Sequence, residues 1–102
     1  MSRLNDLLQE LKEGHTVDVI AGGTSMRGRI EYGQIVTITP VDFHDVQIGD
    51  IVFVRWIKGN YLIHLVKEIN GDQFLIANNV GKINGWVHGT DIIGKITRVV
   101  DP

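Results

Sequence analysis

Short β-branched and aromatic runs, each bounded by a glycine-containing turn, fill most of the chain after Gly14. Such runs are typical of β-strands, because branched and aromatic side chains suit a pleated, half-buried surface. The turns at Lys58-Gly59-Asn60 and Asn70-Gly71-Asp72 resemble hairpin connections. The pattern predicts one mainly β domain. Its strands should lie near residues 17–19, 35–38, 51–56, 61–69, 74–77 and 92–100, with further turns at Tyr32-Gly33, Gly49-Asp50 and Asn84-Gly85.

The first 13 residues have a helical period instead. Four leucines fall on one face of an amphipathic helix: Leu4, Leu7, Leu8 and Leu11. Ser2 can cap the start of this helix, and Gly14 suits its C-terminal end. So short a helix is marginal alone, so we expect it to dock on the β domain. With 102 residues the chain has room for one core, and we divide it into a helix (1–13) and a β domain (14–102).

Composition and charge exclude several classes of function. Cysteine is absent, which excludes disulfides, thiolate chemistry and cysteine-bound zinc. The net charge of −2 gives no long-range attraction to nucleic acid or anionic lipid, and no apolar run approaches a membrane span. We therefore expect a cytoplasmic protein without a membrane or nucleic-acid partner. The four histidines show no HxH or HExxH spacing, so we predict no metal and no cofactor.

The segment Gly22-Gly23-Thr24-Ser25-Met26 is the most informative for chemistry. Two glycines allow a sharp turn, and Ser25 follows near its tip. A nucleophilic hydroxyl needs such exposure, together with backbone N–H groups that can stabilise an oxyanion. A glycine-rich loop with serine and threonine is, however, more often only a loop.

His64 is the second candidate, in the strand Tyr61-Leu62-Ile63-His64-Leu65-Val66. A histidine in so apolar a strand needs a polar partner to offset its desolvation. It is either a hydrogen-bonded core histidine or a general base held for Ser25. Lys67 should face the other way from His64 and lie in solvent.

These segments together resemble the signal peptidase and LexA-type repressor serine protease superfamily. Gly23-Thr24-Ser25-Met26 matches the box around its nucleophile, and Gly49-Asp50-Ile51-Val52 resembles its Gly-Asp-Ile-Val strand. The strand of His64 occupies the place of the strand that carries the base, and Ile92-Ile93-Gly94-Lys95-Ile96 resembles the closing strand. Residues 76–86 are similar to small bacterial and phage-type members. The boxes keep the family's order over roughly residues 14 to 100.

The resemblance implies a compact, coiled β-ribbon or barrel-like body with one N-terminal α-helix. It also implies peptide-bond hydrolysis, in which Ser25 attacks the carbonyl and His64 takes its proton. The Ser25 N–H would help to hold the oxyanion, within the loop formed by Gly23, Thr24 and Met26. A peptide or protein substrate would lie extended along a strand edge.

The chain departs from the family pattern at several positions. Gly28 stands where signal peptidases usually have proline, and Gly23 matches the repressor branch. Ala21-Gly22 resembles a self-cleavage dipeptide but lies too close to Ser25 to enter the site. Histidine-type members have an orienting aspartate, whereas the matching region here is Ala77-Asn78-Asn79 with Asn84 nearby.

Asn84 and Asp91 are therefore the two residues that could orient His64, with strand entry the preferred role for Asp91. Two functions stay open on the sequence. The first is a serine endopeptidase with a Ser25–His64 dyad, and the second is an inactive peptide- or protein-binding domain on the same fold. An exposed strand edge could also support a homodimer.

Overall fold

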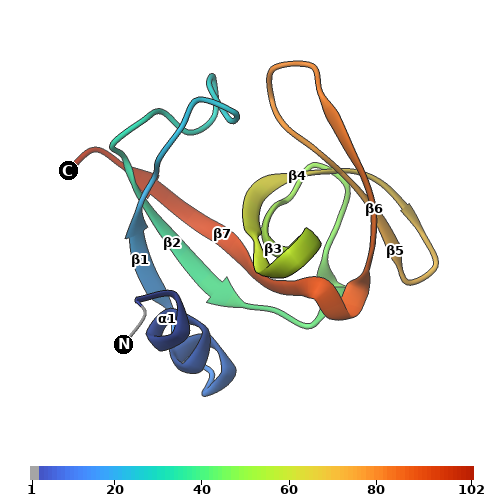
Figure 1. Cartoon of the computed structure of the whole chain (residues 1–102), viewed down its shortest axis with the longest axis horizontal. Coiled ribbons are helices and arrows are strands. Elements are labelled where there is room, and N and C mark those ends of the chain that lie inside the picture. The colour runs from blue at the N-terminus through green and yellow to red at the C-terminus, as the bar shows by residue number, and fades with distance from the viewer. Residues whose placement is uncertain (1–2) are drawn as a thin grey trace.

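In residues 3–102, which the computed structural model describes, seven strands form one open antiparallel sheet in the order β1-β2-β7-β3-β4-β5-β6. The N-terminal helix packs at the end of this sheet that holds β1, β2 and β7 (Figure 1). The mainly β class with one N-terminal helix is thus confirmed. The elements are α1 (Arg3–Lys12), β1 (Val17–Ile20), β2 (Ile35–Pro40), β3 (Ile51–Arg55), β4 (Tyr61–Asn70), β5 (Gln73–Ala77), β6 (Ile83–His88) and β7 (Ile92–Val100).

The predicted hairpins form where glycine permits left-handed backbone. Gly71 and Asp72 alone connect β4 to β5, with Asn70 opposite Gln73 and Gly71 at φ 63°. Between β3 and β4, a 3-10 turn (Ile57–Gly59) places Lys58 at φ 55° and Gly59 at φ 78°. A turn that needs positive φ favours glycine, so the turns at Gly59 and Gly71 could be predicted from the sequence.

The sheet is strongly coiled, and this explains why its central strands are apolar on both faces. In β3 the consecutive residues Val52, Phe53 and Val54 are all buried. Val52 and Val54 join one core cluster, around Phe74 and Ile76, whereas Phe53 joins another beneath α1. A third cluster, around Met26 and Val36, lies under the loop that follows β1. Register shifts in four of the six strand pairs provide the bends that coiling requires.

The helix α1 docks as expected. Leu11 is 3% exposed and packs with Ile38 and Phe53, and the other three leucines lie against the same cluster. Gly14 follows the helix at φ 89°, and its N–H donates to the Leu11 carbonyl at 3.0 Å. The predicted cap Ser2 lies outside the described residues.

The turn predicted at Asn84-Gly85 is wrong, because both residues lie inside β6. Gly85 has φ 143° and sits opposite Ile76, where the register between β5 and β6 shifts. A Cβ at Gly85 would lie 3.3 Å from the Trp56 ring, so the glycine also allows a close approach. Here glycine marks a bulge within a strand rather than a turn between strands.

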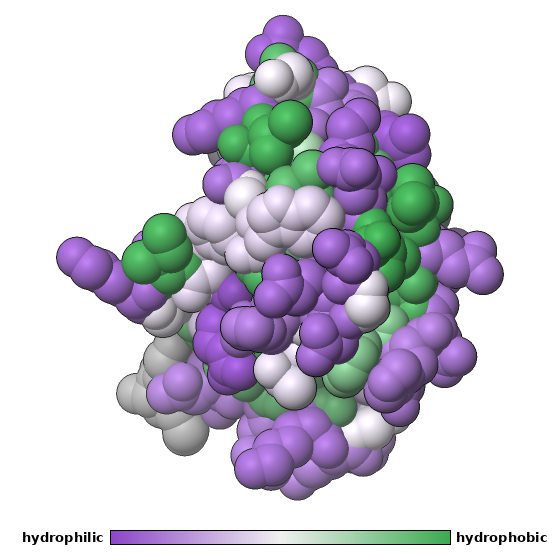
Figure 2. Space-filling view, turned by 90° about the vertical axis from the view of Figure 1, so that its right-hand side faces the viewer, coloured by the Kyte–Doolittle hydropathy of each residue, from purple (hydrophilic) through white to green (hydrophobic). Residues whose placement is uncertain are grey.

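The surface of the molecule carries both hydrophobic and hydrophilic side chains. On the side that carries β5 and β6, hydrophobic side chains form separate patches with hydrophilic ones between them (Figure 2). Val80, Ile83 and Trp86 are among the exposed hydrophobic residues of this region. None of the helices in residues 3–102 is long and apolar enough to span a membrane.

Candidate active site

The loop between β1 and β2 carries Ser25 and is fixed in two places. These are the neck, where its two ends meet, and the floor, where its buried side chains pack on the core. At the neck, Ala21 N–H donates to the Gln34 carbonyl (2.8 Å), and Gly33 N–H donates to the Ala21 carbonyl (2.9 Å). At the floor, Met26 and Ile30 are each 5% exposed and pack in the third core cluster. Buried side chains on either side of a turn hold its tip in place, so Ser25 stands half-buried above them.

His64 reaches this loop from β4, where its backbone lies opposite Val52. Its Nε2 is 3.0 Å from Ser25 Oγ, across 39 positions of sequence. Its Nδ1 is 2.7 Å from Asn84 Oδ1. The Asn84 amide oxygen can only accept, so Nδ1 carries the proton and donates it. The lone pair of Nε2 is then directed at the Ser25 hydroxyl, which donates to it.

Burial sets the protonation state of His64. Its side chain is 6% exposed, and this desolvation lowers the pKa of His64 below its usual value of 6.5. The hydrogen bond to Asn84 acts in the opposite direction, and the positive charge of Lys82 adds to the lowering of the pKa. The imidazole is therefore neutral at pH 7, as a general base must be.

Of the two candidate orienting residues, only Asn84 meets His64. Asp91 instead accepts a hydrogen bond from Arg55 Nε at 3.2 Å, as an ion pair between β3 and the 3-10 turn Gly89–Asp91. Asp91 thus has Arg55, rather than His64, as its side-chain partner. Asn84 reaches the imidazole because it is a strand residue of β6, which the sequence interpretation placed in a turn.

Asn79 was noticed in the sequence only as part of a motif, but it holds the serine loop through three contacts. Its N–H donates to the Ser25 carbonyl (2.8 Å), and its Nδ2 donates to the Arg27 carbonyl (2.7 Å). Its Oδ1 accepts from Arg29 Nε at 3.2 Å. One residue of the β5–β6 loop thus fixes residues 25, 27 and 29 of the loop that carries the hydroxyl.

The backbone around Ser25 offers a free donor. Within residues 3–102, no group accepts a hydrogen bond from the Ser25 N–H. Gly23, at φ 73°, and Thr24 are exposed, and the Thr24 carbonyl accepts from Arg27 N–H (3.2 Å). The side chain of Met26 lies in the core, so it anchors the loop. A free N–H next to a hydroxyl is the donor that an oxyanion needs.

An apolar cleft of about 280 Å³ adjoins the Ser25 hydroxyl. On one side it is bounded by the end of β1 and the start of the loop, residues 20–23. On the other it is bounded by residues 61–64 of β4, with Phe53 and Tyr61 stacked at a centroid distance of 5.3 Å. The cleft therefore connects an apolar surface directly with the Ser25–His64 pair.

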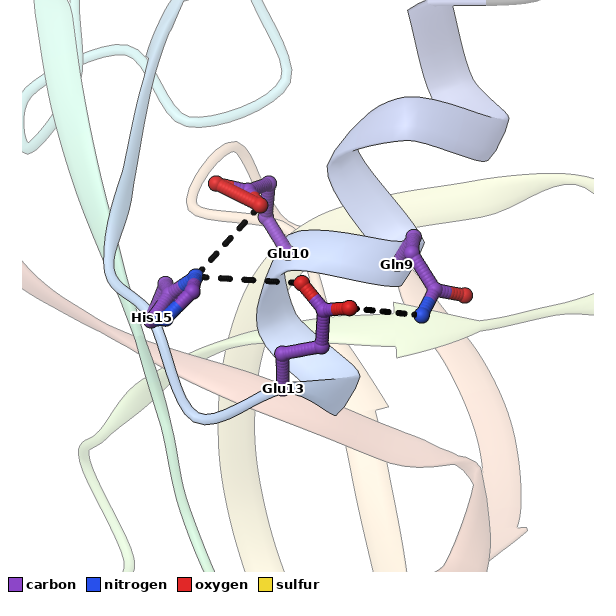
Figure 3. Close-up of polar contacts among 4 residues, drawn as sticks. All are labelled: Gln9, Glu10, Glu13 and His15. Atoms are coloured by element: carbon purple, nitrogen blue, oxygen red, sulfur yellow. Dashed lines mark hydrogen bonds and ion pairs between the residues drawn. The ribbon is translucent and has the colours of Figure 1, made fainter.

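The described residues contain one grouping of three side chains with metal-ligating atoms, at the C-terminal end of α1 (Figure 3). His15 Nδ1 lies 3.4 Å from Glu10 Oε2 and 4.0 Å from Glu13 Oε1. All three side chains are about half exposed, and none lines the apolar cleft. Exposed carboxylates commonly cluster without an ion, so we assign no metal to this grouping.

No protein-family model matches this chain, and no curated protein matches it. The proposal below therefore depends on the motifs and on the geometry of the site.

Proposed function

We propose that this chain is a serine peptidase of the signal peptidase and LexA-type superfamily, with Ser25 as nucleophile and His64 as general base. The observation that carries the proposal is the continuous row Ser25 Oγ, His64 Nε2, His64 Nδ1 and Asn84 Oδ1, with separations of 3.0 and 2.7 Å. A nucleophile next to a base that a third group orients is the arrangement of covalent acyl-transfer catalysis.

The chemistry follows from this row. Ser25 Oγ attacks a peptide carbonyl carbon while its proton moves to His64 Nε2. The resulting oxyanion accepts a hydrogen bond from the Ser25 N–H. The imidazolium then gives its proton to the leaving amine, so the peptide bond breaks and an acyl ester remains on Ser25. Water, deprotonated by the same imidazole, hydrolyses this ester and restores the hydroxyl.

An extended peptide fits the strand edge beside the site. Among the described residues, 61–64 of β4 pair only with β3, because pairing with β5 begins at Leu65. The other edge of this segment therefore borders the apolar cleft. A strand edge offers main-chain hydrogen bonds to any extended peptide, while the cleft selects an apolar side chain. Peptide or protein substrates are thus the class that we propose.

Two observations favour the second candidate function, a binding domain without turnover. Asn84 orients the imidazole but carries no charge, so it stabilises an imidazolium less than a carboxylate would. Burial also disfavours the charged imidazole, as the lowered pKa of His64 shows. Both features slow a step in which His64 becomes positive, and the peptide-binding edge would function without that step.

A fluorophosphonate probe tests the two candidates directly. We expect stoichiometric labelling of the wild-type chain at Ser25, none in Ser25→Ala, and much slower labelling in His64→Ala. The only other serine is Ser2, so Ser2→Ala provides a matched control that should label like wild type. Absence of labelling at every pH between about 6 and 9 would exclude the peptidase and leave the binding domain.

A further inference from the structure

A second hollow, of about 300 Å³, lies at the β5–β6 loop and has two lysines in its lining. It is bounded by Lys67 of β4 and by the β5–β6 loop, including Asn78, Asn79 and Lys82. No aspartate or glutamate lines it. We call this hollow the basic pocket. The mechanism proposed above gives neither lysine a part in proton transfer, although the charge of Lys82 adds to the lowering of the pKa of His64.

The positive charges around the basic pocket are not neutralised. Lys67 and Lys82 are exposed, and neither makes an ion pair within residues 3–102. Arg29 extends the positive region, because its Nε contacts Asn79 at 3.2 Å and it too lacks an ion pair there. The chain as a whole has a net charge of −2, so a local cluster of three cations is not a consequence of composition.

The loop that forms the basic pocket is rigid. Asn78 Oδ1 accepts from Val80 N–H (3.0 Å) and from Lys82 N–H (2.8 Å), and Asn78 N–H donates to the Lys82 carbonyl (2.9 Å). These bonds fix the backbone from which the Lys82 side chain projects. A fixed backbone lowers the entropy cost of binding a ligand between Lys67 and Lys82.

The basic pocket adjoins the loop that carries Ser25. Asn79, which lines it, donates its N–H to the Ser25 carbonyl at 2.8 Å. Along β4, residues 61–64 line the apolar cleft, and Lys67 follows three positions later. At about 3.3 Å per residue, that is a separation of roughly 10 Å. From Leu65 onward β5 occupies this edge of β4, so a peptide that pairs with residues 61–64 must leave β4 and cross the β5–β6 loop to reach the basic pocket.

We infer, on the basis of the function proposed above, that the basic pocket binds an aspartate or glutamate side chain of the same peptide that the apolar cleft holds. An extended peptide advances about as far per residue as β4 does, so the acidic residue lies about two to four positions from the scissile bond. It lies on the side away from the apolar residue. The substrate class is then an extended segment that is apolar on one side of the cleaved bond and acidic on the other.

Binding to the full-length Ser25→Ala variant tests this inference without requiring turnover. The probes are fluorescent decapeptides that carry one apolar residue, leucine or valine, and one variable residue three positions away from it. The variable residue is Asp, Asn or Lys, and it is placed N-terminal to the apolar residue in one set of peptides and C-terminal to it in the other. In one order, the Asp peptide should bind about 5- to 20-fold more tightly than the Asn peptide at low salt. The difference should shrink to about twofold near 0.5 M salt, because these charges are exposed.

Variants of the two lysines should remove this discrimination. Lys82→Gln and Lys67→Gln should each lower the preference for Asp about threefold, and Lys82→Glu should shift the preference toward the Lys peptide. Lys12→Gln changes the same charge at the end of α1 and should bind like the parent. Because all these side chains are exposed, the variants should keep the circular dichroism of the parent.

The outcomes for this inference and for the proposed function are distinct. Equal binding of the Asp and Asn peptides, or binding of neither, would overturn the basic pocket even if Ser25 reacts with the fluorophosphonate. Discrimination without any Ser25 labelling would support the basic pocket and reject the peptidase. Duplex DNA serves as a competitor for the bound Asp peptide. If it displaces this peptide equally well from the parent and from Lys82→Gln, an acidic side chain is not the preferred ligand and the inference fails.

Discussion

His15 and His64 both contact side-chain oxygens, but in opposite surroundings. His15 lies 3.4 Å from Glu10 at the end of α1, where both side chains are at least half exposed (Figure 3). His64 lies 2.7 Å from Asn84 and 3.0 Å from Ser25, and its side chain is 6% exposed. The first histidine has a formal charge partner and the second has neutral ones. On a count of charges alone, the first would appear to be the functional site.

The difference teaches that burial, rather than contact, gives a histidine its chemistry. Water competes with Glu10 for His15, so a pair of this kind contributes about 0–1 kcal/mol. Around His64 water is excluded, each hydrogen bond is stronger, and leaving a nitrogen unpaired is costly. The imidazole of His64 is thereby held in one tautomer and one orientation. The predictions below test that contrast.

The largest effect should come from removing each imidazole in turn. His64→Ala should slow the reaction of Ser25 with a fluorophosphonate by about 100- to 10,000-fold, the usual contribution of a positioned general base. His15→Ala should leave the rate unchanged. Mass spectrometry of the labelled chain over time measures both rates. Equal rates for His64→Ala and wild type would mean that Ser25 is not activated by this imidazole.

The residues of that first contrast show how much the sequence could predict. The strand around His64 and the glycine hinge before Ser25 are local features, and both are found from residue type and spacing. Their proximity, at 39 positions apart, followed only from the order of motifs that resemble the peptidase superfamily. The structure brings them together, and their catalytic role stays a prediction.

Asn84 and Asn79 show where sequence reasoning failed. A glycine after Asn84 suggested a turn, but the coiling of the sheet uses that glycine as a bulge and brings Asn84 to His64. The contacts of Asn79 with the serine loop join positions 50 and 52 residues apart. Such pairings depend on how the β5–β6 loop folds back over the sheet, which no local pattern encodes.

The next largest effect should come from Asn84, whose oxygen sets the tautomer of His64. Asn84→Ala leaves the buried Nδ1–H without an acceptor, so we expect unfolding to become easier by about 1–3 kcal/mol and Ser25 labelling to slow by about tenfold or more. Asn84→Asp should accelerate labelling, since a carboxylate stabilises the imidazolium. Urea denaturation and labelling kinetics check both variants. An Asp variant slower than Asn84→Ala would contradict the role of Asn84 as an orienting residue.

A smaller but distinctive effect concerns pH. Burial lowers the pKa of His64 below 6.5, so Ser25 labelling should fall with acidification at a lower pH than an ordinary histidine would give, and level off at higher pH. Between that lowered pKa and 6.5 the unfolded chain binds more protons than the folded chain, so the free energy of unfolding should rise with pH in this window. Proton NMR titration of wild type and His64→Gln would identify the resonance. A His64 pKa above 6.5 would contradict the assigned burial effect.

The smallest effect should come from Asn79, which touches the serine loop but neither the hydroxyl nor the imidazole. Asn79→Ala removes the side-chain contacts to Arg27 and Arg29 but keeps the backbone bond to Ser25. The loop should hold Ser25 less firmly, with labelling slowed about 3- to 10-fold and unfolding easier by about 1 kcal/mol. Asn79→Asp keeps the acceptor for Arg29 and loses only the donor to Arg27, so its rate should fall between those of Asn79→Ala and wild type. The pH profile of Asn79→Ala should not move, because that variant alters neither the contacts of His64 nor the charges around it. A shifted profile would show that the loop and the imidazole are coupled, and that the row from Ser25 to Asn84 is not fixed by its own hydrogen bonds.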